Sequence, residues 1–598
     1  MSIVDTIKQV AAEAIKKVFR VEINAADIAV NATKPEFEGD YTIVLFSLIK
    51  QLKKAPDVAG NELGNYLLQN HFDLFSAFNV IKGFLNLVIA DSYWINFLQE
   101  NYNNKSFGSK EKTGKKVMVE YSSPNANKPL HLGHLRNNFL GWSIAEILKA
   151  NGNEIVKTCI VNDRGIHICK SMVAWKFFAN RATPESTGIK GDHFVGDYYV
   201  KFNDEYKKQV NELVANGMSK GEAEKEAPIL KAAQQMLIDW EAGKPDVIEL
   251  WKKMNNWVYR GFEETYKRIG SDFDRIYYES NTYLLGKDMV QYGLDKGVFF
   301  MKEDGSVWID LIADGLDEKI VQRRDGTSVY ITQDIGLVLN KYEEYKCDQS
   351  IYVVGDEQNY HFKVLKLIAQ KLQLPSAEGI YHLSYGMIEL PTGKMKSREG
   401  TVVDADDIID EMMRIAQQKT EELGKVKDFT DAELEELYNT IGLGALKFFL
   451  LRVDPKKRMI FNPEESIDFH GFTGPFVQYT HARIKSILRK VQVASYQLPV
   501  ASHQLSSGKL LDLEKQVITQ LEQFPVVIDE AANEHDPSKV AIYVFNLAKM
   551  YNTFYTEHSV TNAETEEKKI LRLQLSQLTA HTIKTAMHLL GIQVPERM

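Results

Sequence analysis

The chain has 598 residues, of which 44% are hydrophobic and 26% charged, and its formal net charge is −9 at pH 7. This length suits about three or four domains, and the acidic balance excludes a generally basic nucleic-acid coat protein while leaving room for a local basic patch. The three cysteines, Cys159, Cys169 and Cys347, form no C-x-x-C pair, which excludes a disulfide framework and a four-cysteine zinc site.

The N-terminal segment 1–19 is expected to form an amphipathic helix with charges throughout, and it lacks the apolar core of a signal peptide. No apolar run reaches the roughly 20 residues that span a bilayer. We therefore expect a cytoplasmic protein without a membrane partner. The rest of residues 1–108 is expected to complete a small α/β module, with a pair of strands around Gly83 and a polar linker at 101–116.

Residues 117–134 predict a buried strand, a polar loop with two prolines, and the start of a helix at His131-Leu132-Gly133-His134. A helix N-terminus offers unpaired N–H groups and a positive dipole end, which suit a phosphate. The two histidines share one face of the first turn, and Gly133 allows a ligand to approach closely. Spacing alone leaves a metal half-site or two surface histidines open, although a zinc site would need more ligands.

Residues 156–163 predict a second buried strand, so this part of the chain forms a β-α-β unit with parallel strands. Ligands of such nucleotide-binding folds lie at the carboxyl ends of the strands. We therefore expect the polar run 162–167 beside the same crevice. Within it, Arg164 and His167 receive no detailed role.

Residues from about 181 to 290 are rich in charge and in helix formers, and their aromatic side chains have the spacing of packed helices. Further on, strand-like segments are expected at 306–312, at 323–332 with a turn at Asp325-Gly326, and at 349–355. Helices are expected at 332–346 and 363–374. Tyr330 and Asp334 are four residues apart, so they share a helical face if the helix starts early. Taken alone, such a pair is usually solvent-facing.

Residues 386–403 place Lys394, Lys396 and Arg398 among small or flexible neighbours. The pattern is typical of an exposed charge run, and it also suits a mobile loop that binds phosphates. Helical periodicity then predominates from 405 to 598, and residues 472–492 interleave aromatic with basic side chains. Such a helix suits RNA phosphates and bases, or a solvated face packed on its aromatic side.

The string SSPNANKPLHLGH, residues 122–134, closely resembles the HIGH region of class I aminoacyl-tRNA synthetases, and its Ser-Pro-Asn lead-in and Lys128 resemble the arginyl enzymes. Residues 386–403 resemble the KMSKS loop in its arginyl variant, with Ser397 where most class I enzymes have a second lysine. In arginyl enzymes with this gap, the lysine that Lys128 matches is thought to compensate. The resemblance extends from Gly39-Asp40-Tyr41 to the closing Pro-Glu-Arg-Met.

The resemblance implies an α/β fold in three parts. These are an N-terminal α/β domain at 1–108 that touches the tRNA elbow, a Rossmann-like parallel-sheet catalytic domain at 109–405 with an insertion at about 181–290, and a C-terminal all-α linker and anticodon-binding bundle at 406–598. It also implies tRNA contacts in the two outer parts, at Tyr41, Phe84, Tyr479, Arg483 and Arg489. Three residues after Tyr41, members of the family often carry an asparagine, whereas this chain has Val44.

The implied activity is an arginine–tRNA ligase that forms arginyl-adenylate from L-arginine and ATP, with Mg²⁺, and transfers the arginyl group to the 3′ end of tRNA(Arg). The first step needs positioning and charge stabilisation more than covalent help. The implied catalytic residues are Lys128, His131, His134 and Lys394, with Asn125, Gly133, Met395, Lys396, Ser397 and Arg398 as further ATP-binding residues. The implied arginine-binding residues are Glu120, Asn125, Tyr330, Asp334 and Gln358.

Three alternatives remain. A class I synthetase of another specificity, such as cysteine, would be expected to show zinc-ligand cysteines and a more standard KMSKS loop. A non-catalytic tRNA-binding paralogue would be expected to lack some of the residues named above, and a simpler nucleotidyltransferase would not need the helical tail. We expect a monomer with no DNA partner and, as in the family, arginine activation that requires bound tRNA.

Overall fold

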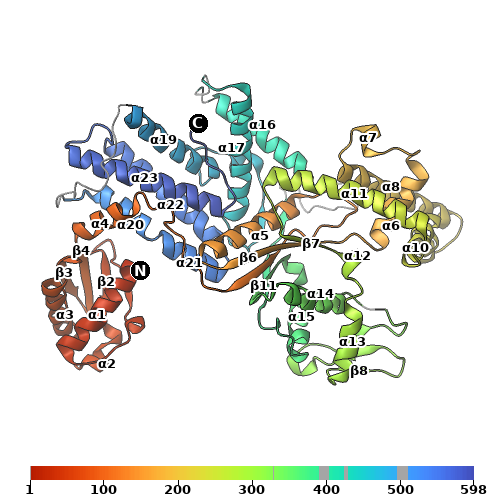
Figure 1. The fold of residues 1–598 in the computed structure, drawn as a ribbon, viewed down its shortest axis with the longest axis horizontal. Helices are drawn as coiled ribbons and strands as arrows, with labels where there is room; N and C mark the ends of the chain where they lie inside the picture. Colours follow the sequence, from red (N-terminus) through yellow and green to blue (C-terminus); the bar gives the residue numbers. More distant parts are fainter. Residues whose placement is uncertain (1, 328, 390–402, 423, 425–427, 494–508) are drawn as a thin grey trace.

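The computed structural model describes residues 2–327, 329–389, 403–422, 424, 428–493 and 509–598, and Figure 1 shows their arrangement. An N-terminal module lies at one end, a parallel sheet lies near the middle, and helical regions flank the sheet on both sides. This arrangement confirms the predicted α/β fold class with an N-terminal α/β part and a C-terminal helical part. Within the described ranges, no helix has the length and apolar character that crossing a membrane requires.

The N-terminal module is an antiparallel sheet covered by helices. Its strand order is β1-β2-β4-β3, with β1 Val30–Ala32, β2 Tyr41–Val44, β3 Phe75–Ile81 and β4 Phe84–Ile89, and the covering helices are α1 Ile3–Phe19 and α3 Pro56–Asn70. Lys82 and Gly83 connect β3 to β4 with φ angles of 47° and 79°. A two-residue turn with two positive φ angles matches the twist of the strands that it joins, so the predicted strand pair around Gly83 is confirmed.

A five-stranded parallel sheet forms the centre of the molecule, in the order β12-β11-β5-β6-β7. The strands are β5 Lys116–Glu120, β6 Glu154–Val161, β7 Arg275–Tyr278, β11 Gln349–Gly355 and β12 Ile380–Tyr385. Helix α5, Leu132–Ala150, connects β5 to its neighbour β6, which confirms the predicted β-α-β unit. The chain leaves β5 toward β6 on one side and later returns as β11 on the other, so a crevice forms at the carboxyl ends of β5 and β11.

The segment between β6 and β7 is a group of packed helices, drawn in yellow at the right of Figure 1. They include α6 Ile166–Phe178, α8 Gly191–Ala215, α10 Pro228–Glu241 and α11 Pro245–Ile269. Trp257 is buried against Trp175 and Phe194, with ring centroids 6.0 and 5.5 Å away. These contacts confirm that the aromatic spacing of this segment reflects core packing.

A small antiparallel sheet and three helices follow, with a hydrophobic core of their own. The strands are β8 Phe299–Met301, β9 Val307–Ile309 and β10 Lys319–Gln322, and the helices are α13 Gly286–Asp295, α14 Tyr330–Tyr345 and α15 Asn359–Lys371. The predicted turn at Asp325-Gly326 is confirmed, but the strand predicted after it is wrong, because α14 has already begun at Tyr330. The alternation of polar and apolar residues in this segment arises from a turn followed by a helix N-terminus.

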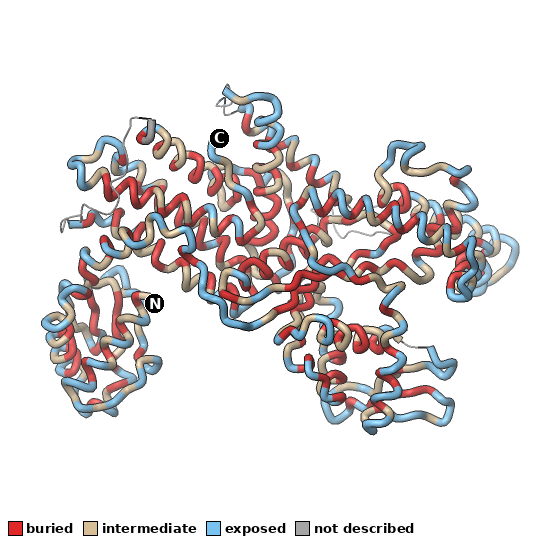
Figure 2. The backbone as a smooth tube through the Cα atoms, viewed as in Figure 1, coloured by how far each residue is buried: buried red, intermediate tan, exposed pale blue. Residues whose placement is uncertain are grey.

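The C-terminal region is helical, and Figure 2 shows buried stretches along its helices as well as in the sheet region. Its longer helices are α16 Ala405–Glu422, α17 Asp431–Leu451, α19 Gly474–Val493, α20 Asp512–Glu522, α21 Phe524–Glu534, α22 Ser538–Glu557 and α23 Glu566–Leu589. The hydrophobic core is shared, since α17, α21 and α23 all contact α5. The C-terminal helices are therefore packed directly against the helix that follows the HIGH region.

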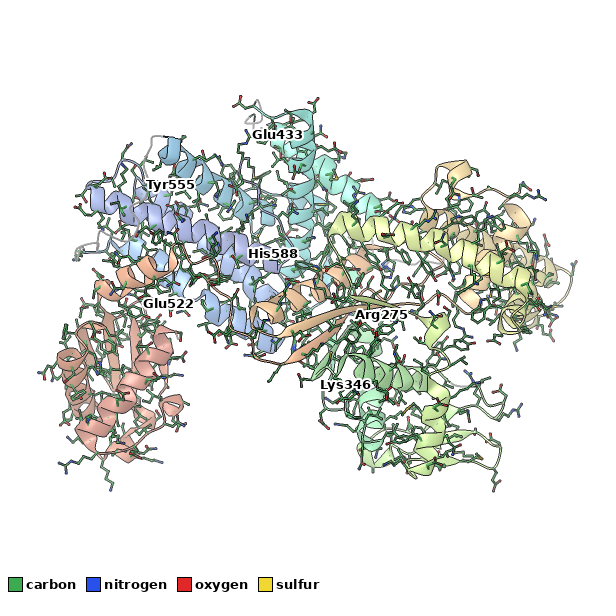
Figure 3. The ribbon with its side chains drawn as sticks, viewed as in Figure 1. Arg275, Lys346, Glu433, Glu522, Tyr555 and His588 are labelled. Carbon is green, nitrogen blue, oxygen red and sulfur yellow. The ribbon has the colours of Figure 1, made fainter. Side chains whose placement is uncertain are left out.

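The end of α23 and the tail that follows it are held through their backbone carbonyl groups. Side chains of α5, α17 and α19 donate hydrogen bonds to them: Ser143 to Leu589 at 2.7 Å, Lys447 to Gly591 at 2.6 Å, Gln478 to Gln593 at 2.8 Å, and Arg489 to Glu596 at 2.7 Å. His481 lies 3.0 Å from the carbonyl of Pro595. In Figure 3, His588 at the end of α23 is labelled beside α5, and its ring meets Trp142 edge-on at 5.7 Å.

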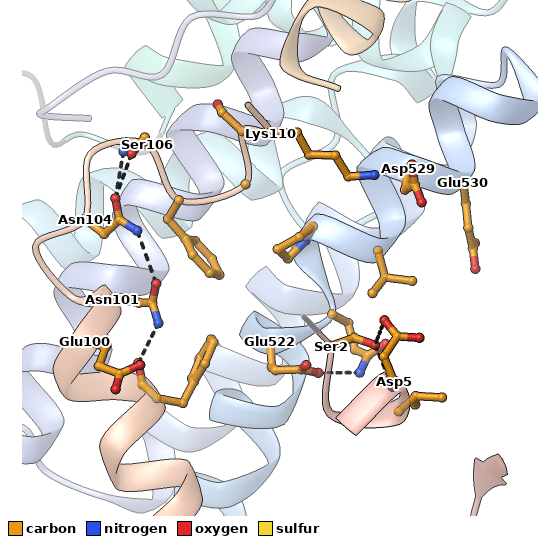
Figure 4. Close-up of a pocket in the computed structure, with 18 of the residues that line it drawn as sticks. Ser2, Asp5, Glu100, Asn101, Asn104, Ser106, Lys110, Glu522, Asp529 and Glu530 are labelled. Atoms are coloured by element: carbon orange, nitrogen blue, oxygen red, sulfur yellow. Dashed lines mark hydrogen bonds and ion pairs between the residues drawn. The ribbon is translucent and has the colours of Figure 1, made fainter. Parts of the chain in front are cut away.

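The N-terminal module is joined to the C-terminal helices by polar contacts. Lys515 lies 2.8 Å from Asp40, and Glu522 accepts a hydrogen bond of 2.6 Å from the backbone N–H of Ile3. Burial raises the pKa of Glu522. A cavity of about 1020 Å³ lies at this junction, lined by acidic side chains that include Asp5, Glu522 and Asp529 (Figure 4). It contains none of the residues predicted to bind ATP or arginine.

Candidate active site

The loop that follows β5 is held in an uncommon backbone conformation. Ser122 and Ser123 have φ angles of 78° and 47°, and residues in this region cost on the order of 1–3 kcal/mol each unless their surroundings fix them. Here the N–H of Ser122 donates to Asn137 of α5 at 2.5 Å, and its hydroxyl lies 2.6 Å from that of Tyr266. The loop is thus fixed from α5 and α11 before it reaches the HIGH residues.

The end of β6 supports the other side of the loop. The N–H of Asn162 donates to the carbonyl of Pro124 at 2.9 Å, and the N–H of Ala126 donates back to Asn162 at 3.0 Å. Asn125 is exposed at this edge and Lys128 is partly buried. The structure therefore brings the predicted polar run at 162–167 next to the HIGH loop, as the strand order requires.

His131 and His134 form a reciprocal cap at the start of α5. The N–H of Gly133 donates to Nδ1 of His131 at 3.1 Å, and the N–H of His131 donates to Nδ1 of His134 at 3.1 Å. The two ring centroids are 3.9 Å apart. Because both Nδ1 atoms accept hydrogen bonds, each neutral imidazole carries its proton on Nε2. Each ring can therefore donate to a ligand through Nε2.

Both imidazoles favour the neutral form. Burial, with a smaller contribution from the charge of Lys128, lowers the pKa of His131 to about 3. Burial also places the pKa of His134 well below its ordinary value, and the neighbouring His131 and Lys128 add to this effect. At neutral pH the pair therefore offers uncharged hydrogen-bond donors, and positive charge at this site comes from lysine.

The predicted unpaired N–H groups of the first helical turn are not available. Leu132 donates to the carbonyl of Val403 at 3.3 Å, Gly133 donates to the ring of His131, and His134 donates to the carbonyl of His131 at 2.7 Å. The cap formed by the HIGH residues satisfies these groups internally. The donors that remain for a phosphate are the imidazole Nε2–H groups rather than the backbone of the helix.

A cavity of about 210 Å³ opens beside the histidine pair. Its lining comes from three parts of the chain: the HIGH loop with Lys128 and His131, helix α8 with His193 and Tyr199, and Asp404 at the start of α16. The predicted residues of the second phosphate-binding loop, Lys394, Met395, Lys396, Ser397 and Arg398, lie outside the described residues. The segment that follows that loop, from Val403 onward, is described and lies against the HIGH residues.

The predicted arginine pocket is centred on α14. Tyr330 is the first residue of the helix and Asp334 lies one turn further, so the two side chains share a face. Tyr330 is 75% exposed. Nε2 of His361, on α15, lies 2.7 Å from Oδ2 of Asp334. Gln358 is exposed just after the carboxyl end of β11, on the same side of the sheet.

Glu120 ends β5 and forms a buried ion pair with Lys341 of α14. Their side chains are 9% and 2% exposed, and Thr158 also donates to Glu120 at 3.4 Å. Sequence reasoning did not identify Lys341. Its position seven residues after Asp334, on the same face of α14, was the available signal.

The residues predicted to contact tRNA differ in exposure. Tyr41 is only 6% exposed, and Gln523 donates to its hydroxyl at 3.3 Å, so its ring offers little surface to RNA. Phe84 is 39% exposed and meets Phe46 edge-on, with ring centroids 5.5 Å apart. Phe46, which is 52% exposed, was not identified from the sequence.

On α19, the guanidinium of Arg483 lies over the ring of Tyr479 at 4.9 Å and donates to Asn552 at 2.9 Å. Arg489 is held by the carbonyl of Glu596, as described above. The interleaved aromatic and basic residues thus form an ordered face on which cations and rings are paired. His481 of the same helix is buried, and burial lowers its pKa to about 4.

Arg164 and His167, to which the sequence assigned no role, are tied into the helical insertion. The guanidinium of Arg164 lies over the ring of Tyr283 at 4.0 Å and is paired with Glu241 at 3.0 Å. Nδ1 of His167 lies 3.0 Å from the hydroxyl of Tyr199. These contacts fix the carboxyl end of β6 against α8 and α10.

Comparison with known families matches almost the whole chain. The family model described as "tRNA synthetases class I (R), catalytic domain" matches residues 97–462. The model "Arginyl tRNA synthetase N terminal domain" matches residues 5–89, and "DALR anticodon binding domain" matches residues 477–598.

Individual proteins give the same result over the full length. The arginine–tRNA ligase of Flavobacterium psychrophilum is 54% identical and that of Bacteroides thetaiotaomicron is 51% identical, each covering 100% of both chains. Among solved structures, Thermus thermophilus arginyl-tRNA synthetase superposes with a TM-score of 0.77 at 24% identity, covering 99% of each chain. The Plasmodium falciparum enzyme gives 0.75 at 17% identity, covering 100% of this chain and 99% of that one. These two likenesses show a common fold.

Proposed function

This chain belongs to the arginyl-tRNA synthetase family of class I, and on that premise we propose that it is an arginine–tRNA ligase. It activates L-arginine with ATP to arginyl-adenylate and transfers the arginyl group to the 3′ end of tRNA(Arg). One observation supports the proposal beyond family membership: the histidine pair follows β5, and His361, which lies 2.7 Å from Asp334, follows the adjacent strand β11.

In the activation step, the arginine carboxylate attacks the α-phosphate of ATP and pyrophosphate leaves. Charge then spreads over the phosphate oxygens, and preorganised donors stabilise it. His131 and His134 donate from Nε2, and Lys128 supplies a positive charge from the loop before them. Their rings are already fixed by the cap of α5, so they lose little freedom when the substrate reacts.

The second set of phosphate contacts in the proposal comes from Lys394, Met395, Lys396, Ser397 and Arg398, with Lys394 as a catalytic residue. Asn125 and Gly133 complete the ATP site near the histidine pair. ATP enters as its Mg²⁺ complex, so the ion is part of the substrate. The resemblance of this loop to the KMSKS segment and the exposure of Asn125 support these assignments.

Arginine recognition rests on Asp334 and Tyr330. The carboxylate of Asp334 accepts paired hydrogen bonds from the guanidinium while the ring of Tyr330 covers its plane, a geometry that a lysine ammonium would match poorly. Gln358, Asn125 and Glu120 bind the α-amino end. Both hydrogen bonds described for Glu120 end on Oε2, so Oε1 can accept from the ligand's ammonium group.

The tRNA contacts in this proposal lie at the two ends of the molecule. Phe84 of the N-terminal module faces the elbow of the tRNA, with an exposed ring that suits base stacking. Tyr479, Arg483 and Arg489 form part of the anticodon-binding face. The protein acts as a cytoplasmic monomer, and arginine activation requires bound tRNA.

The deciding experiment is arginine-dependent exchange of labelled pyrophosphate into ATP, measured with and without tRNA(Arg). Exchange only in the presence of tRNA supports both the specificity and the requirement for tRNA. Exchange without tRNA keeps the specificity and removes the requirement. Absence of exchange under both conditions, with tRNA binding intact, would favour a non-catalytic tRNA-binding relative.

A further inference from the structure

A cluster of charged side chains connects the helical insertion to residues 403–406, at the start of α16. At its centre, Nζ of Lys190 lies 2.6 Å from Oγ1 of Thr265, 2.7 Å from Asp406 and 3.1 Å from Asp192. These partners come from α11, α16 and α8. One ammonium group therefore joins three helices that are far apart in the sequence.

His193 forms the second half of this cluster. Its Nε2 lies 3.1 Å from Asp406 and 3.4 Å from Asp404. The hydrogen bond that His193 donates to Asp406 raises the pKa of His193. Asp404 in turn accepts from the N–H of Asp406 at 2.8 Å, which fixes the start of α16. The cluster holds Asp404 and Asp406, which flank the first residue of α16.

The same segment also pairs with the HIGH residues through its backbone. Leu132 donates to Val403 at 3.3 Å, and Ala405 donates to Leu130 at 3.0 Å, so Asp404 and His131 lie opposite each other in a short antiparallel bridge. The backbone of this segment therefore contacts the HIGH loop, while its side chains are held by Lys190 and His193.

Helix α8 touches the HIGH loop directly as well. A side chain at Gly196 would place its Cβ 2.8 Å from Cδ of Pro129. Three parts of the chain are therefore in mutual contact here: the HIGH loop, helix α8 and the segment at 403–406. A shift of α8 would therefore displace both the HIGH loop and the segment at 403–406.

The burial of the cluster argues for a positioning role. The side chains of Asp192, Asp404, Asp406 and Lys190 are 0%, 12%, 17% and 20% exposed. A buried ion pair adds little net stability, but removing one partner leaves a costly unpaired charge, so the arrangement resists displacement. Asp192, His193 and Asp406 are also close enough together to hold a metal ion, but the ammonium of Lys190 already bridges the two carboxylates.

We propose that Lys190 and His193 are positioning residues for arginine activation: at the start of helix α8 they hold residues 403–406 against the HIGH loop and thereby fix the loop that carries the histidine pair. This inference rests on the proposed function and adds residues to it. Neither side chain touches the reacting atoms. Their effect is on the geometry of the transition state, since a misplacement of about 1 Å in such a site costs about 100-fold in rate.

The test uses the full-length protein and two sets of variants. Lys190→Met removes the ammonium while keeping the length of the side chain. His193→Ala removes the ring, and His193→Gln restores a donor near the position of Nε2. Lys201→Met is the matched control, because Lys201 is also on α8 and forms an exposed ion pair with Glu205 at 2.9 Å.

The readouts are tRNA-dependent pyrophosphate exchange, with kcat and the KM values for ATP and arginine, and the Kd for tRNA(Arg). We expect Lys190→Met and His193→Ala to lower kcat about 100-fold, with KM for arginine and Kd for tRNA within about twofold of the wild type. His193→Gln should recover most of the loss, and Lys201→Met should match the wild type.

A parallel loss of kcat and tRNA binding would overturn the inference, because it would indicate general damage to the insertion. Unchanged kcat in both lead variants would overturn it as well. Should Lys190→Met fail to fold, the comparison of His193→Ala with His193→Gln decides the matter alone. Inactive wild-type protein would instead contradict the proposed function, so the two failures are distinguishable.

Discussion

Replacing Asp334 by alanine should separate arginine recognition from ATP recognition. A hydrogen bond to a charged group contributes about 1.5–3 kcal/mol, and a guanidinium that spans both carboxylate oxygens makes two of them. The side chain of Asp334 is 39% exposed, so solvent competes and the lower end of the range applies. The loss is then about 3 kcal/mol, or on the order of 150-fold in kcat/KM for arginine.

The assay is pyrophosphate exchange in the presence of tRNA, with arginine and ATP varied separately. Because the proposed ATP contacts come from other loops, KM for ATP should change by less than about threefold in Asp334→Ala. Glu343→Ala is the matched control, since Glu343 is an exposed acid on the same helix. Equal losses for arginine and ATP, or a loss for arginine below about threefold, would refute the pocket assignment.

Three further predictions concern buried ionisable side chains. Lys341→Met should destabilise the protein by about 3–5 kcal/mol, because it strands the carboxylate of Glu120, and adding Glu120→Gln should recover part of the loss in a thermal melt; additive losses would contradict this. His131 and His134 should stay neutral between pH 5.5 and 8, since their pKa values are lowered. Their NMR signals, assigned with the variants His131→Asn and His134→Asn, should therefore not shift with pH in this range. An inflection near pH 6.5 would contradict the prediction. Burial lowers the pKa of Lys447 to about 8. Between that pH and about 10.5 the unfolded chain binds more protons than the folded one, so the free energy of unfolding should rise with pH. In thermal melts across this range, Lys447→Met should show a smaller rise in stability than the wild type, and identical pH profiles would argue against the buried ammonium.

The sequence predicts best where local chemistry decides the structure. The turn at Lys82-Gly83, the β-α-β unit around α5 and the shared helical face of Tyr330 and Asp334 all follow from short-range patterns, and the structure confirms them. The family resemblance adds the order of the parts, because it depends on a string of residues rather than on periodicity.

The sequence predicts less well where distant residues meet. The first turn of α5 is capped by the HIGH histidines and by Val403, so its N–H groups are satisfied by partners that periodicity cannot reveal. The strand predicted after the turn at Asp325-Gly326 fails because the start of a helix can produce the same alternation of polar and apolar residues. Lys341, Lys190 and His193 lack a local motif, and only the packing of separate helices gives them their partners.

The hold on the C-terminal tail has a consequence for the order in which the protein can mature during synthesis. Ser143 of α5 and its acceptor Leu589 are separated by 446 residues, and the buried ammonium of Lys447 finds its acceptor only at Gly591. Until these acceptors have been made, burying either donor would cost about 1–3 kcal/mol, because the donor would leave water without a partner. The helix that follows the HIGH residues reaches its final packing only after residues 589–591 have been made, so the first-made part of the catalytic centre is among the last to be completed.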